Sequence, residues 1–190
     1  MSYLMNKHEQ RMCELQADFF ELSVSSFPCG SSFFIAKFMQ SPAAKELDNV
    51  DDPYNFSSPN NLITYMKEEF SSLNKERGEQ YPKSVLRWIG YIYRAWNIIS
   101  KRTSSYLYKK MKANKLLSLY DSFHTFSPEY CVERLEEIVE EINKMQISDY
   151  EIYKRIVAKK DIDGARIRDL EMVFGTLPKE ALNDDDISRE

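Results

Sequence analysis

The sequence predicts an all-α protein: an irregular bundle of six to eight helices in one domain. Hydrophobic residues make up 43% of the 190 residues and aromatic residues 13%, which is enough for a packed core. The chain has only five glycines and seven prolines, which disfavours a turn-rich β sandwich or barrel. Apolar residues recur at helical spacing, and no segment shows the alternation of a strand.

The first half of the chain predicts two helical segments and a loop. Residues 4–27 form the first segment, which ends before Pro28. Residues 33–47 form the second, and Pro42 inside it predicts a break or kink at Ser41, where a new helix can start. Residues 48–59 are rich in Asp, Asn, Ser and Pro and predict a loop.

The second half of the chain predicts further helices with recognisable ends. Gly78 fits a helix C-cap, and Ser127, Pro128 and Glu129 are typical of a helix start. A break near Ala113 divides one of the segments. The predicted helices cover residues 60–77, 82–101, 106–123, 128–146, 149–160 and 165–174.

The distribution of apolar residues predicts two parts. Residues 1–147 form the helical bundle, and residues 148–190 form a less tightly packed C-terminal helical arm with an acidic tail. Large apolar residues are fewer in the second part, so it either packs on the domain or needs a partner to order it.

Charge is segregated along the chain, although the formal net charge is only −4. Between Glu79 and Asp121 there are nine lysines and arginines and no acid, and the same stretch is rich in tryptophan and tyrosine. Residues 121–151 hold nine acids against Arg134 and Lys144. A basic segment rich in aromatics is typical of a surface that meets an anion or an acidic protein. Alternatively, the basic segment pairs with the acidic residues 121–151 of the same chain.

The helix predicted over residues 82–101 has two faces. Its inward stripe consists of Val85, Ile89, Ile92, Trp96 and Ile99. Arg87, Tyr91 and Arg94 follow at i, i+4 and i+7 and form a second stripe, which we interpret as a candidate partner-binding surface. The alternative is structural: the aromatic residues belong to the core, and the arginines bridge to the helix predicted over residues 128–146, which is rich in glutamate.

Six further cations form a second candidate site, for an anion or nucleic acid. They lie in and around a predicted turn and contribute the charges that phosphate contacts need. No spacing among them singles out a recognition helix for DNA. The residues are Lys101, Arg102, Lys109, Lys110, Lys112 and Lys115.

Catalytic and metal sites are not expected. His124 lies near Asp121 and Tyr120, as a general base could, but a histidine in this position more often caps a helix end. No nucleophile elbow, HExxH motif or glycine-rich phosphate loop is present. Three scattered cysteines and two histidines give no metal-ligand spacing. We therefore expect a non-enzymatic protein without cofactors or metals.

The N-terminal sequence is charged within its first turns and lacks the apolar region of a signal peptide. No stretch of eighteen apolar residues predicts a membrane span. The unclustered cysteines are typical of reduced thiols. A cytoplasmic location and no membrane partner are therefore expected.

Four segments carry a resemblance to a group of small bacterial proteins. They are FFIAKFMQSPAAKELD (33–48), WIGYIYRAW (88–96), SSYLYK (104–109) and YDSFHTFSPEYCVERLEEI (120–138). The group, which the chain resembles over about residues 20–140, is labelled as antitoxin components of toxin–antitoxin pairs. The His-Thr segment is also similar to a second family, encoded beside ADP-ribosyltransferase-like toxins. The resemblance implies a helical, cytoplasmic, non-enzymatic partner protein and assigns no site residue.

Two functions from different classes follow as expectations. The first is an antitoxin-like interaction protein that binds and neutralises a cognate bacterial toxin through the Arg87, Tyr91 and Arg94 stripe, with the acidic tail at residues 184–186 as a conceivable plug. The second is a nucleic-acid-binding protein, acting on an operator or an RNA, which uses the cations of residues 101–115.

Overall fold

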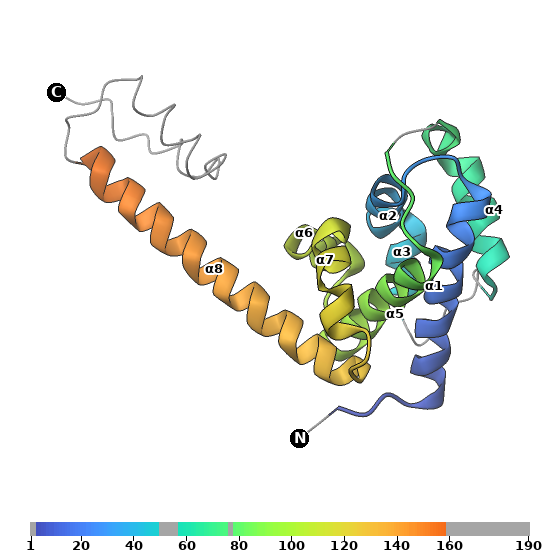
Figure 1. The fold of residues 1–190 in the computed structure, drawn as a ribbon, viewed down its shortest axis with the longest axis horizontal. Helices are drawn as coiled ribbons and strands as arrows, with labels where there is room; N and C mark the ends of the chain where they lie inside the picture. The colour runs from blue at the N-terminus through green and yellow to red at the C-terminus, as the bar shows by residue number, and fades with distance from the viewer. Residues whose placement is uncertain (1–2, 50–56, 76–77, 159–190) are drawn as a thin grey trace. The chain divides into compact units, whose positions relative to one another are not determined.

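The computed structural model describes residues 3–49, 57–75 and 78–158, with side chains up to residue 144. Within these ranges the protein is all-helical and contains no strand, which confirms the predicted fold class. Figure 1 shows the arrangement of the elements. They are α1 (Lys7–Ser26), α2 (Ser31–Met39), α3 (Pro42–Leu47), α4 (Pro59–Glu69), the 3₁₀ turn η1 (Ser71–Asn74), α5 (Lys83–Ser100), α6 (Ser104–Lys110), α7 (Ala113–Phe123) and α8 (Pro128–Ala158).

The chain divides into two compact units, Met1–Glu137 and Ile138–Glu190. The first unit is a helical bundle whose principal contact joins α1 and α5, two helices that lie side by side although they are about seventy residues apart in the sequence. The predicted boundary between residues 147 and 148 stays a prediction. The helix predicted over residues 165–174 and the acidic tail lie outside the described residues.

Glycine allows the close approach of α1 and α5. A Cβ atom built on Gly90 would lie 2.7 Å from the backbone carbonyl oxygen of Gln16 and 3.0 Å from the Cα of Ala17. Contacts this short with another helix's backbone are excluded for any side chain. Opposite this seam, Val85, Ile89 and Trp96 of the predicted inward stripe are buried. The helix therefore has two packed faces instead of one.

Local sequence signals explain most helix ends. Ser41 caps α3 by accepting from the amide of Ala44, and Pro42 occupies the first turn, so the predicted break is confirmed. Asn6 and Glu9 form a reciprocal capping box at the start of α1. Lys101 ends α5 with φ 57° and ψ 25°, a left-handed conformation that costs a residue with a side chain about 1–2 kcal/mol.

Two predicted boundaries are wrong. The helix predicted over residues 60–77 ends at Glu69 and is followed by η1, whose tighter turn carries Leu73 into the core. The helices predicted over residues 128–146 and 149–160 are one continuous helix of 31 residues. No glycine or proline follows Pro128 within α8, so nothing in the sequence interrupts its hydrogen bonds.

Candidate functional site

The predicted stripe of Arg87, Tyr91 and Arg94 lies on one face of α5, and that face is turned toward α1. Arg87 forms ion pairs with Glu14, Asp18 and Glu21 of α1, the last with an N···O distance of 3.6 Å. Its hydrogen bond with Asp18 raises the pKa of the guanidinium above its ordinary value. The guanidinium is therefore already satisfied within the fold.

Arg94 is fully buried, so the expectation that it is presented to a partner is wrong. Its Nε and Nη2 donate to Oε1 of Gln16 at 3.0 and 2.7 Å. Its Nη1 donates to the Leu47 carbonyl at 2.7 Å, to Asp48 Oδ1 at 3.0 Å and to Asn97 Oδ1 at 2.8 Å. Burial lowers the pKa of Arg94, while Asp48 acts in the opposite direction. The residue is a structural junction between α1, α3 and α5.

Tyr91 is half-buried on the same side of α5. Burial, with smaller contributions from Cys13 and Glu14 of α1, raises the pKa of its hydroxyl to about 12. The i, i+4, i+7 spacing thus identified one face of the helix correctly, but the face packs on α1. A partner-binding role for Arg87 and Tyr91 stays a prediction.

The six cations of residues 101–115 divide into two kinds. Arg102 forms an ion pair with Glu136 of α8 at 2.9 Å and stacks over the Tyr106 ring, 5.2 Å from its centroid. The amine of Lys110 lies 5.8 Å from the same ring. The other four cations are exposed and form no ion pair with a described residue: Lys101, Lys109, Lys112 and Lys115. The last three of them lie close together in the sequence, from the end of α6 to the start of α7.

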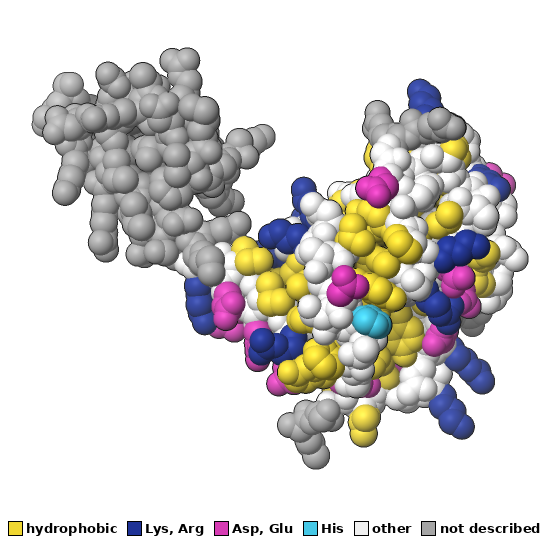
Figure 2. Space-filling view, viewed as in Figure 1, with side chains coloured by type: hydrophobic (Ala, Val, Ile, Leu, Met, Phe, Trp, Pro, Cys, Tyr) yellow, Lys and Arg dark blue, Asp and Glu magenta, His cyan; other side chains and the backbone are white. Residues whose placement is uncertain are grey.

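An exposed aromatic cluster lies where α7 passes into α8, and sequence reasoning missed it. Phe126 is 46% exposed and Tyr130 is 45% exposed, although both are large apolar residues. Their ring centroids lie 5.1 Å apart in an edge-to-face contact, and Phe123 lies 6.1 Å from Phe126. Figure 2 shows hydrophobic side chains gathered on one face of the molecule. The available signal was a run of aromatic residues, Phe123, Phe126 and Tyr130, which spans the end of α7, the turn after it and the first turn of α8.

His124 has a local role at the end of α7. Its Nδ1 lies 2.9 Å from the carbonyl oxygen of Tyr120, and its ring stacks on the Tyr120 ring at 4.7 Å. The expectation that it caps a helix end is confirmed. Within the described residues, the His124 ring bonds the Tyr120 carbonyl and not Asp121, the partner that a general base would need.

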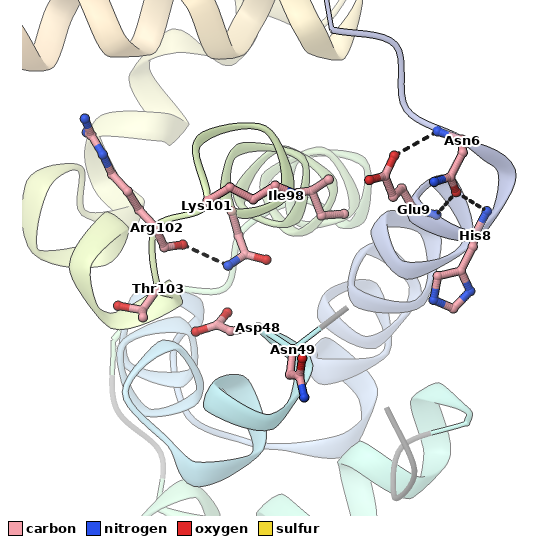
Figure 3. Close-up of a pocket in the computed structure, with 10 residues that line it drawn as sticks. Asn6, His8, Glu9, Asp48, Asn49, Ile98, Lys101, Arg102 and Thr103 are labelled. Atoms are coloured by element: carbon pink, nitrogen blue, oxygen red, sulfur yellow. Dashed lines mark hydrogen bonds between the residues drawn. The ribbon is translucent and has the colours of Figure 1, made fainter. Parts of the chain in front are cut away.

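A hollow of about 320 Å³ lies elsewhere on the bundle. Two of the six cations predicted to bind an anion, Lys101 and Arg102, line it, but no sequence pattern indicated a cavity. Figure 3 shows its walls, which come from the start of α1, the end of α3, and the last turn of α5 with the turn that follows. All of the lining residues except Ile98 are of polar or charged types. The residues are Asn6, His8, Glu9, Asp48, Asn49, Asn97, Ile98, Lys101, Arg102 and Thr103.

No group of three His, Cys, Asp or Glu side chains suited to a metal occurs among the residues that the structure describes. Cys13, Cys29 and Cys131 are free thiols and buried. Burial raises the pKa of Cys13 to about 12 and that of Cys131 to about 11, so neither is an activated nucleophile. In the described part of the chain, no helix has the length and apolar character needed to cross a membrane.

No protein-family model, curated protein or solved structure matches the chain.

Proposed function

We propose that the chain is a non-enzymatic interaction protein of the antitoxin type, which binds and neutralises a cognate bacterial toxin. The observation that carries the proposal is the exposed aromatic cluster of Phe126 and Tyr130, supported from below by Phe123. Aromatic side chains held in place by their neighbours bind partners at a low entropic cost, and they dominate the energetics of protein interfaces.

The charges beside the cluster favour a protein partner with a basic rim. Asp121 and Glu133 are exposed, Glu129 is half-buried, and none of the three forms an ion pair within the described residues. Apolar anchors surrounded by unpaired charges of one sign suit a partner surface that is apolar at its centre and positive around it. An anionic polymer would be repelled by the same acids.

The segments that carry the resemblance to antitoxin components differ in their exposure. In WIGYIYRAW, Gly90, Arg94 and Trp96 are buried and have a role in packing. The segment YDSFHTFSPEY places Phe126 and Tyr130 at the surface, where packing does not explain them. Under the proposal, the first segment builds the bundle and the second meets the toxin.

Capture followed by a growth assay tests the proposal. The tagged chain is used to isolate partners from its native host, and each captured protein is expressed alone in a heterologous bacterium. We expect one of them to arrest growth and co-expression of the chain to restore it. Phe126→Ser with Tyr130→Ser should abolish both capture and rescue, whereas Leu22→Ser, which changes a similarly exposed apolar residue on α1, should preserve them. Rescue by the double variant at the wild-type level would refute the role of the cluster.

A second candidate function is nucleic-acid binding, favoured by Lys109, Lys112 and Lys115, which are exposed and form no ion pair with a described residue. Each phosphate contact would contribute to a steep dependence of affinity on salt. Fluorescence anisotropy with random duplex DNA and with single-stranded RNA measures this directly. Undetectable binding at low ionic strength would remove the candidate, and binding that survives replacement of all three lysines by glutamine would place it elsewhere.

A further inference from the structure

The hollow at the ends of α1, α3 and α5 has a rigid polar floor. Arg94, buried beneath it, donates to Asp48 and Asn97, both of which line the hollow. Asp48 also accepts from the amide of Ser104 at 2.8 Å, and Asn97 Nδ2 donates to the Arg102 carbonyl at 2.8 Å. Side chains fixed by several hydrogen bonds form a preorganised surface, which lowers the entropic cost of binding a ligand.

Internal pairing leaves two unbalanced charges of opposite sign in the lining. Asp48 is balanced by Arg94, and Arg102 is balanced by Glu136, toward which its guanidinium is directed. Glu9 accepts from the Tyr3 hydroxyl and from the Asn6 amide, and no cation pairs with it in the described part of the chain. The Lys101 amine lies 5.9 Å from the Tyr3 ring and forms no ion pair with a described residue. A positive and a negative group therefore line one small hollow without neutralising each other.

Lys101 occupies a position where the backbone alone would favour glycine. It ends α5 in the left-handed conformation, and its amide donates to the Asn97 carbonyl at 2.9 Å. Glycine provides this cap without strain. The lysine side chain contributes nothing to the cap, but Lys101 lines the hollow, and its amine lies 5.9 Å from the centroid of the Tyr3 ring. Backbone strain of this kind is found preferentially at functional sites.

We propose that the hollow is a binding site for a small zwitterion of the α-amino-acid class. The ligand carboxylate would pair with the Lys101 ammonium, and its ammonium group would pair with the Glu9 carboxylate. The volume of about 320 Å³ lies at the lower end of small-molecule sites and suits a ligand of this size. The site differs from the aromatic cluster and from the lysines of residues 109–115, so it stands or falls independently of the proposed function.

A thermal-shift screen of the full chain against each of the twenty L-amino acids tests the proposal, with calorimetry for the tightest binder. The matching amine without the carboxylate and the matching acid without the amine are then measured as controls. We expect at least one amino acid to bind and both single-charge analogues to bind at least tenfold more weakly. If no amino acid binds, or if one analogue binds as tightly as its amino acid, the proposal is overturned.

Two variants assign the charges. Lys101→Gly should raise the unfolding temperature, because it removes the strained backbone, and should weaken amino-acid binding at least tenfold. Glu9→Gln keeps the capping box and should weaken binding by a similar factor. Lys112→Gly, at the N-cap of α7 away from the hollow, is the matched control and should leave affinity unchanged. Unchanged affinity in Lys101→Gly would refute the assigned role of the ammonium.

Discussion

Two regions of the molecule contain cations and aromatic residues but differ in how far these side chains are paired and buried. One is the seam between α1 and α5, and the other is the segment from α6 to the start of α8. In the seam, Arg87 pairs with three acids of α1, and Arg94 has a hydrogen-bond partner for every nitrogen of its guanidinium. In the other segment, Phe126 and Tyr130 are exposed, and Lys109, Lys112 and Lys115 lack ion pairs in the described structure. Composition alone does not separate these outcomes. The difference depends on whether another helix of the same chain, with complementary charges and shape, covers the helix face that carries these residues.

The comparison predicts that the largest loss of stability comes from Arg94. Arg94→Met should lower the free energy of unfolding by about 3–5 kcal/mol, because it leaves the largely buried Asp48 carboxylate without its cation. Urea denaturation measures the change. Arg134→Met is the control, since that arginine is exposed and, among the described residues, pairs with Glu137 three residues on; it should cost about 0.5 kcal/mol or less. A similar loss in both variants would contradict the structural role of Arg94.

Gly90 should give the next largest effect. Gly90→Ala places a methyl group 2.7 Å from a backbone oxygen of α1, so the helices must separate, at a cost of about 1–3 kcal/mol. The effect runs against helix propensity, which favours alanine over glycine by about 1 kcal/mol. Ser84→Ala on the exposed side of α5 provides the control and should change stability little. If Gly90→Ala were stabilising, α1 and α5 would not lie as close as described.

Arg87 should contribute less than its number of ion pairs suggests. Its side chain is 42% exposed, and pairs that solvent reaches are typically worth about 1 kcal/mol or less. Arg87→Gln should therefore cost about 1 kcal/mol at low salt, and less as salt screens the pairs. Denaturation at two ionic strengths measures both effects. A large, salt-independent loss would mean that the guanidinium is much better protected than its exposure indicates.

The smallest effect on stability should come from the aromatic cluster. Phe126→Ser and Tyr130→Ser each remove a side chain that is nearly half exposed, so each should cost about 1 kcal/mol or less. Thermal and urea unfolding of the single variants test this. A loss comparable with that of Arg94→Met would show that the cluster serves the core, and it would weaken the interface proposal.

The sequence predicted the fold class and many helix ends because these depend on local chemistry. Pro42 after Ser41 and Pro128 after Ser127 mark helix starts wherever the helix lies. The candidate site was harder to predict. Periodicity placed Arg87, Tyr91 and Arg94 on one face, but it contains no information about which helix covers that face. The exposure of Phe126 and the hollow beside Lys101 depend on contacts between distant segments, which no local pattern reveals.

The central claim is that the chain meets its partner through Phe126 and Tyr130 and uses the α1–α5 seam for stability. The most direct measurement is the affinity for the captured partner of two variants with intact folds, Phe126→Ser with Tyr130→Ser and Arg87→Gln. We predict at least a hundredfold loss for the first and less than a threefold change for the second, since aromatic hot spots contribute several kcal/mol and Arg87 is engaged with α1. The reverse pattern would contradict the account and restore the stripe on α5 as the binding surface.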